Sequence, residues 1–254
     1  MKLHITNTPK ELGVAAGKAA ADLIRKALAG KGKANIILAT GSSQFETLEQ
    51  LIKEDIDWSK ITMFHLDEYI GLPESSPASF RKYLKDRFLS KVPALESVNL
   101  VNGEGSPEEE CSRLGDIISK NPIDVALVGI GENGHLAFND PPADFETDKP
   151  FLVVNLDEPC RMQQLGEGWF ETIEDVPKQA ISMSIRQIMK AEHIICSVPD
   201  SRKARAVKDS LEQPVGNDYP SSILQMHPDC RLYLDKASAS QLSDGLISKH
   251  TIGL

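Results

Sequence analysis

The sequence lacks the features that mark several large classes of protein. Its 254 residues include only four cysteines, Cys111, Cys160, Cys196 and Cys230, and no two of them form a Cys-x-x-Cys pair. This wide spacing argues against a disulfide scaffold and against a cysteine zinc site. We therefore expect a reduced, cytoplasmic protein that holds no metal.

Long apolar runs and basic clusters are missing as well. No stretch approaches the roughly eighteen apolar residues that a membrane helix needs, and residues 1–13 contain no apolar signal core. The 28 lysines and arginines are outnumbered by 37 aspartates and glutamates, which gives a net charge of −9. Because a duplex DNA binder presents a basic face, we expect neither nucleic acid nor a membrane as a partner.

The chain does contain an alternation of short apolar runs and helical periodicities, with enough apolar residues (41%) for a full core. Strands that are apolar on both faces and alternate with helices are typical of a mostly parallel sheet covered on both sides. We predict an α/β fold, a single-domain, Rossmann-like three-layer sandwich over residues 1–254. Strands are expected at 35–40, 61–66, 124–129, 151–156, 193–198 and 231–234; helices at 10–29, 43–53, 79–89, 107–119, 184–191, 201–210 and 237–248; and loops or lids at 141–149 and 164–168.

In sheets of this kind, ligands bind beyond the carboxyl ends of the strands, and four polar motifs fall at such positions. The first is Thr40-Gly41-Ser42-Ser43, which joins a strand to a helix. Free backbone N–H groups at such a turn can bind phosphate. Alternatively, Ser43 and Glu46 form an ordinary capping box. The motif is neither a Walker loop nor a Gly-x-Gly-x-x-Gly fingerprint, so it does not indicate a nucleotide site.

The second motif is the carboxylate pair Asp67-Glu68, which follows an apolar strand. In an extended chain the two side chains point to opposite sides, so that one can enter a site while the other bonds to the scaffold. Burial raises the pKa of a carboxyl group toward the range of a general base. The alternative is a solvated turn pair. His65, in the interior of the strand, is interpreted as a packed histidine.

The third and fourth motifs follow two later strands. A glycine-rich turn from Gly129 leads to His135, which is flanked by Asn133 and Asp140. An amide and a carboxylate beside a histidine can fix its tautomer and raise its basicity. Lys203 lies in the first turn of the helix predicted over 201–210, where a cation opposes the helix dipole unless an anion lies nearby. We therefore treat Lys203 as a candidate phosphate ligand, with a solvated lysine as the alternative.

Together the four motifs resemble the glucosamine-6-phosphate deaminase (isomerase) family, which shares its fold with the 6-phosphogluconolactonases. The resemblance extends from about residue 35 to residue 235. Its matching stretches are Thr40-Gly41, Leu66-Asp-Glu-Tyr-Ile-Gly-Leu-Pro73, Gly131-Glu-Asn-Gly-His-Leu-Ala-Phe-Asn-Asp-Pro141, Ser201-Arg-Lys-Ala204 and Ser222-Ile-Leu-Gln-Met-His-Pro228. The combination of Asp-Glu-Tyr with Asn-Gly-His-x-Ala-Phe-Asn is far more specific than any single motif.

The resemblance implies conversion of glucosamine 6-phosphate and water to fructose 6-phosphate and ammonia, with no metal or cofactor. By similarity, Asp67 takes the C2 proton and returns it at C1, and His135, oriented by Asn133 and Asp140, assists ring opening. The substrate- and phosphate-binding residues expected on this basis are Thr40, Gly41, Ser42, Ser43, Glu68, Gly129, Lys203 and Arg161.

The sequence also departs from the family pattern. Asp140 stands where glutamate is usual, and Asn133 where some members carry aspartate. The segment 160–170 has Glu167 near the place of an arginine that contacts phosphate in many deaminases, so Arg161 is the expected substitute. The basic residues of the hexamers' allosteric site are missing around 150–153, and we therefore expect a monomer or small homo-oligomer without that activation.

Three other functions remain open. The same chemistry can act on galactosamine 6-phosphate. The 6-phosphogluconolactonases favour Asp-Glu-Arg and Asp-Gly-His-Thr-Ala, whereas this chain has Tyr69 and Leu136-Ala-Phe-Asn139. A non-catalytic sugar-phosphate sensor would bind its ligand without releasing ammonia.

Overall fold

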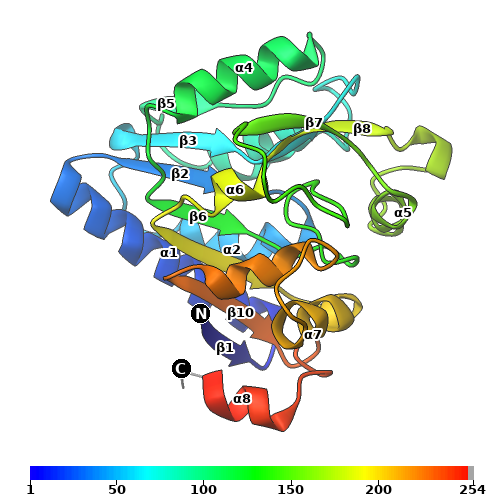
Figure 1. The fold of residues 1–254 in the computed structure, drawn as a ribbon. Helices are drawn as coiled ribbons and strands as arrows, with labels where there is room; N and C mark the ends of the chain where they lie inside the picture. Colours follow the sequence, from blue (N-terminus) through cyan, green and yellow to red (C-terminus); the bar gives the residue numbers. More distant parts are fainter. Residues whose placement is uncertain (251–254) are drawn as a thin grey trace.

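The structure, a computed structural model, describes residues 1–250 (Figure 1). Its strands are β1 (Lys2–Thr6), β2 (Ala34–Leu38), β3 (Ile61–His65), β4 (Asp67–Tyr69), β5 (Ser97–Asn99), β6 (Val125–Val128), β7 (Phe151–Asn155), β8 (Gln179–Met183), β9 (His193–Val198) and β10 (Cys230–Asp235). Its α-helices are α1 (Pro9–Lys31), α2 (Phe45–Leu51), α3 (Phe80–Leu84), α4 (Pro107–Ile118), α5 (Glu158–Gly166), α6 (Ile185–Ile188), α7 (Ala204–Glu212) and α8 (Asp244–His250).

Seven strands form a central sheet in the order β1-β10-β9-β6-β2-β3-β5, and every neighbouring pair is parallel. The chain proceeds from β2 to β3 in one direction and later returns to β6 on the other side of β2. The carboxyl ends of β2 and β6 therefore flank a topological switch point, which is where open α/β sheets bind ligands. The predicted mostly parallel sheet is confirmed.

Helices and a second sheet cover the two faces of the central sheet, giving the predicted three layers (Figure 1). On one face α1 and α2 pack together, and the apolar side chains of α1 meet those of β2, β3 and β6 in one core cluster. On the other face α4, α6 and α7 pack in a second cluster with the antiparallel sheet β4-β8-β7. Helix α1 has clear boundaries, since the Thr8 side chain accepts a hydrogen bond from Glu11 N–H and Gly32, in the left-handed conformation, ends the helix.

Several local predictions were wrong. Residues 151–156 were expected in the parallel sheet, but β7 belongs to the antiparallel one. The stretch 164–168 was predicted to be a loop, yet its first residues end α5, a helix capped by the Asp157 side chain. The predicted helix over 237–248 begins only at Asp244. Strands β1, β4, β5 and β8 and helix α5 were not predicted. As for membranes, none of the helices described is both long and apolar enough to span one.

Candidate active site

A small pocket lies at the carboxyl ends of the central strands, with a cavity volume of about 70 Å³. The segments that follow β2, β3, β6 and β9 all contribute to it, as expected for parallel strands whose ends share one edge. The predicted residues that line it are Thr40, Gly41, Ser42, Ser43, Asp67, Gly129, His135 and Lys203. The fold thus brings together residues that lie far apart in the sequence.

Asp67 lies at the junction of the two sheets. Strand β3 ends at His65, and the next residue, Leu66, still bonds through its N–H to the Leu38 carbonyl of β2 at 3.3 Å. The Leu66 carbonyl accepts a bond from the N–H of Met183, after which the chain turns into β4. Burial, together with the charge of Glu68, raises the pKa of Asp67 to about 8. A carboxyl group with that pKa is suited to take and return a proton near neutral pH.

Glu68 was expected among the substrate-binding residues, but its side chain points away from the pocket and is fully buried. Its carboxylate accepts hydrogen bonds from the Ser79 hydroxyl (2.8 Å) and from the N–H groups of Tyr69, Phe80 and Arg81, and it pairs with the Arg81 guanidinium at 3.2 Å. These bonds anchor the start of α3. The alternation of side chains in β4 explains why Asp67 faces the pocket and Glu68 the scaffold.

His135 is held in a fixed orientation by the loop around it. Its Nδ1 lies 3.1 Å from Asp140 Oδ1, and the Asn133 amide donates to the same oxygen at 2.9 Å. Burial alone would raise the pKa of Asp140, but the bonds from His135 and Asn133 outweigh it, so the pKa lies below its usual value. An ionised carboxylate only accepts hydrogen bonds. We infer that Nδ1 carries the proton and that the lone pair of Nε2 is available to a substrate.

Neither Asn133 nor Asp140 lines the pocket, but both form hydrogen bonds with His135, which does. Asn133 holds the loop at two points, because its side-chain oxygen also accepts the His135 backbone N–H at 3.1 Å. The imidazole packs on Gly131, where a Cβ atom would lie 2.3 Å from Cε1 and Nε2 of the ring. Glycine at this position therefore allows the loop to close over the histidine.

His135, Asp140 and Cys160 together offer three metal-ligand atoms within 4.8 Å of one another. The chemistry of these donors fits a hydrogen-bonded network better than a metal site. The Asp140 carboxylate already accepts bonds from His135, Asn133 and the Asp157 N–H. Burial raises the pKa of the Cys160 thiol well above its usual value, which disfavours the thiolate that binds metals.

The Gly41–Ser43 turn and Lys203, which were predicted to bind phosphate, lie together at the anion-binding end expected for the pocket. Gly41 has a positive φ of 91°, and Ser42 begins a 3₁₀ turn that leads into α2. The alternative capping box is not formed, since no side chain caps this turn. Lys203 is 3% exposed, and burial lowers the pKa of its ammonium although Glu167 opposes that effect.

Arg161, the expected substitute for the phosphate-binding arginine, does not reach the pocket. Its guanidinium donates to the backbone carbonyls of Val176 and Ile173, where it ties α5 to the following segment. The pocket is instead completed by residues that were not predicted to contact substrate, namely Gln163, Gln164, Glu167, Phe80 and Phe138. Two of them carried a signal in the sequence: Phe138 belongs to the motif that carries the resemblance, and Glu167 is a departure from the family pattern.

The comparison with known proteins agrees with this geometry. The family model of glucosamine-6-phosphate isomerases and 6-phosphogluconolactonases matches residues 7–232. The chain belongs to this family. Within the family it is 39% identical to a glucosamine-6-phosphate deaminase of Listeria monocytogenes over 90% of this chain and 96% of the relative. It is 34% identical to one of Bacillus cereus over 98% and 92% of the two chains.

Solved structures of the family have the same fold. A monomeric glucosamine-6-phosphate deaminase matches with a TM-score of 0.85 and 33% identity, over 94% of this chain and 99% of that one. A 6-phosphogluconolactonase from Trypanosoma brucei matches with a TM-score of 0.78 but only 19% identity, over 95% and 98% of the two chains. The second match shows the shared fold alone.

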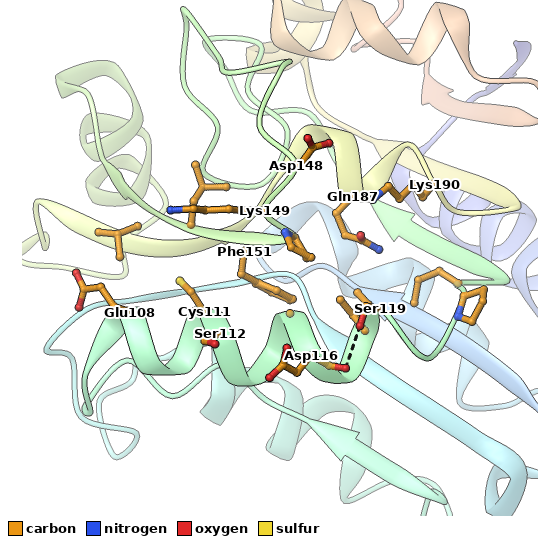
Figure 2. Close-up of a pocket in the computed structure, with 17 residues that line it drawn as sticks. Glu108, Cys111, Ser112, Asp116, Ser119, Asp148, Lys149, Phe151, Gln187 and Lys190 are labelled. Atoms are coloured by element: carbon orange, nitrogen blue, oxygen red, sulfur yellow. Dashed lines mark hydrogen bonds between the residues drawn. The ribbon is translucent and has the colours of Figure 1, made fainter.

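A larger cavity, of about 880 Å³, lies elsewhere, between α4 and the segment that begins β7 (Figure 2). Figure 2 shows Cys111 on the side of α4 that faces Phe151. None of the predicted site residues lines this cavity. Asp67, His135 and Lys203, the groups with predicted roles, are instead gathered in the smaller pocket.

Proposed function

We propose that this protein is a glucosamine-6-phosphate deaminase, which converts glucosamine 6-phosphate and water to fructose 6-phosphate and ammonia. The observation that carries the proposal is the presence of Asp67, His135 and Lys203 in one pocket at the switch point of the sheet. A buried base, an oriented imidazole and a cation are the groups that this reaction needs. The names of the relatives support the substrate.

The phosphate would bind to the Gly41–Ser43 turn and Lys203. This places the sugar ring toward Asp67 and His135, which line the same pocket. His135 Nε2 would accept the proton of the C1 hydroxyl and return it to the ring oxygen, and this transfer opens the ring. Asp140 stabilises the imidazolium formed on the way, because the Asp140 carboxylate already holds the Nδ1 proton.

Asp67 would then remove the proton from C2 and deliver it to C1 through an enolamine. The electrons of the C2–H bond form the C1–C2 double bond, and the C1 oxygen takes up a proton. Protonation at C1 leaves an iminium at C2, which water hydrolyses to the ketone and ammonia. A base that returns the same proton needs a pKa near the working pH, and Asp67 meets this condition.

The free state of all four cysteines supports the cytoplasmic setting expected from the sequence. The match to a monomeric relative over 94% of the chain supports a monomer or small homo-oligomer. Such an enzyme would act in amino-sugar metabolism.

The test is a parallel assay of three substrates. Release of ammonia and fructose 6-phosphate from glucosamine 6-phosphate is expected, with little or no turnover of galactosamine 6-phosphate or 6-phosphogluconolactone. Ammonia release from galactosamine 6-phosphate alone would show that the galactose epimer is the substrate. Hydrolysis of 6-phosphogluconolactone alone would show that the protein is a lactonase and would contradict the proposed reaction. Binding of the amino-sugar phosphates without ammonia release would indicate a sensor.

A further inference from the structure

Glu167, which the proposed mechanism does not use, lies at the anion-binding end of the pocket. It follows directly after α5, and its side chain is only 4% exposed. One carboxylate oxygen accepts hydrogen bonds from the Ser42 hydroxyl at 3.1 Å and from Trp169 Nε1 at 3.2 Å. The other accepts from Gln163 Nε2 at 2.9 Å and lies 4.0 Å from Lys203 Nζ.

These contacts involve the groups assigned to the phosphate. Ser42 and Lys203 both lie next to Glu167, so the carboxylate of Glu167 lies where the phosphate of the substrate is expected to bind. We propose that the Glu167 carboxylate occupies the phosphate position of the ligand-free protein, and that the substrate's phosphate displaces it. Glu167 then determines the affinity of the site for phosphate. This inference rests on the proposed function for the identity of the ligand.

Charge and space both require Glu167 to leave. A phosphate monoester carries a charge of about −1.5 to −2 near pH 7, and it would have to share Lys203 with a carboxylate in a buried site, where like charges repel strongly. The cavity of about 70 Å³ holds a few water molecules. A hexose phosphate has many more non-hydrogen atoms than that volume admits, so at least one lining group must move.

The surroundings of Glu167 allow that movement. Gly166 and Gly168 flank it, and Gly168 adopts a positive φ of 80° that other residues rarely accept. The residue as a whole is partly exposed although its side chain is buried, so its backbone already lies at the surface. A rotation of the side chain is therefore enough to bring the carboxylate into water while α5 stays in place.

The arrangement also explains how the site tolerates a buried lysine without ligand. Burial of an unpaired ammonium favours its neutral form. Glu167 opposes that effect on Lys203. In the ligand-free protein, the Glu167 carboxylate thus favours the charged form of Lys203 and holds it in position. The same carboxylate lowers the affinity of the site for phosphate, because it has to be displaced.

The experiment uses Trp169 as a reporter, because its indole N–H donates to the carboxylate that is to leave. The chain has only two tryptophans, and the other, Trp58, is buried beside Phe88 near the start of β3. In a Trp58→Phe background, titration with inorganic phosphate or glucosamine 6-phosphate should change the Trp169 emission with saturation. Saturable binding measured by calorimetry without any change in emission would overturn the proposal.

The second arm is independent of the reporter and compares two charge-matched variants in the wild-type background. Glu167→Gln should bind inorganic phosphate and glucosamine 6-phosphate about tenfold more tightly, a change that corresponds to about 1.4 kcal/mol. Glu174→Gln is the control, because Glu174 is exposed on the short turn that follows α5, and it should change the affinity by less than about twofold. Unchanged or weaker phosphate binding by Glu167→Gln would show that the carboxylate is structural.

The two proposals can fail separately. If Glu167→Gln binds phosphate more tightly but no amino-sugar phosphate is turned over, the displacement stands and the proposed function fails. If ammonia is released but phosphate binding is indifferent to Glu167, the function stands and the displacement fails.

Discussion

The Asp67→Asn variant should lose activity and gain stability, and the gain should depend on pH. Asp67 is buried, and among residues 1–250 its carboxylate has no hydrogen-bond partner to stabilise its charge. Burial and the charge of Glu68 raise its pKa from 3.8 to about 8. Each unit of that shift corresponds to about 1.4 kcal/mol.

The sign follows from the protons bound in each state. Between pH 3.8 and about 8 the native protein keeps a proton on Asp67 that the unfolded chain has released. The contribution of this group to the free energy of unfolding is therefore largest at low pH and is lost as the pH rises to about 8. Because asparagine does not ionise, the variant escapes this loss. Relative to wild type, its free energy of unfolding should increase by about 2 kcal/mol between pH 6 and pH 8.

The assay is urea unfolding of wild type and variant at pH 6, 7 and 8. Asp116→Asn, which changes an exposed aspartate on α4, is the matched control and should show no pH-dependent difference. The activity of Asp67→Asn should fall by about 10²- to 10⁴-fold, the usual contribution of a general base, while substrate binding is kept. A stability difference that stays constant from pH 6 to pH 8 would refute the assigned pKa, and near wild-type turnover would refute the role.

Other predictions concern the rest of the site. In the wild type, kcat/KM should rise with pH and level off above about 8, because Asp67 must be ionised to act; a flat pH–rate profile would contradict this. Lys203→Met should raise KM about 10- to 100-fold, because a charge-assisted contact with the phosphate is lost, and kcat should change little. An unchanged KM in steady-state kinetics would show that Lys203 does not bind the phosphate. Asp140→Asn should lower kcat by about 10²-fold or more by releasing the imidazole, and a kcat within threefold of wild type would show that His135 does not need it. Arg81→Met leaves the charge of Glu68 buried without its partner and should cost about 3–5 kcal/mol of stability; an unchanged urea midpoint would show that the other bonds to Glu68 suffice.

The central sheet could be predicted because its strands carry their signal locally. The inner strands β2, β3 and β6 are buried on both faces and are mostly apolar, although β2 contains Asn35 and β3 contains Thr62 and His65. The two edge strands carry a weaker signal. In β1, Lys2, His4 and Thr6 interrupt the apolar pattern, and β5 has only three residues. The sheet to which β7 belongs depends on its pairing with β8, a contact between distant segments that no local pattern encodes.

In the candidate site, too, local signals in the sequence predicted some residues, and contacts between distant segments decided the others. Asp67, His135 and Lys203 were predicted because each follows a strand whose end fixes its position. The contact between Glu167 and the Gly41–Ser43 turn was not predicted, because it joins residues 125 positions apart. Arg161 was predicted to bind phosphate because it lies a few residues upstream of the place of the family's arginine, but nearby carbonyl groups satisfy its guanidinium instead.

The charge of Glu68 affects the pKa of its neighbour Asp67, although only Asp67 faces the pocket. Strand alternation separates their side chains, and their surroundings then separate their chemistry. Glu68 accepts hydrogen bonds from Ser79, Arg81 and backbone N–H groups. Asp67 instead faces the pocket and lies close to the negative charge of Glu68. That charge adds to the effect of burial and raises the pKa of Asp67 further. Glu68 thus raises the pKa of the proposed base, so that Glu68→Gln should lower the pKa seen in the pH–rate profile even though Glu68 does not line the pocket.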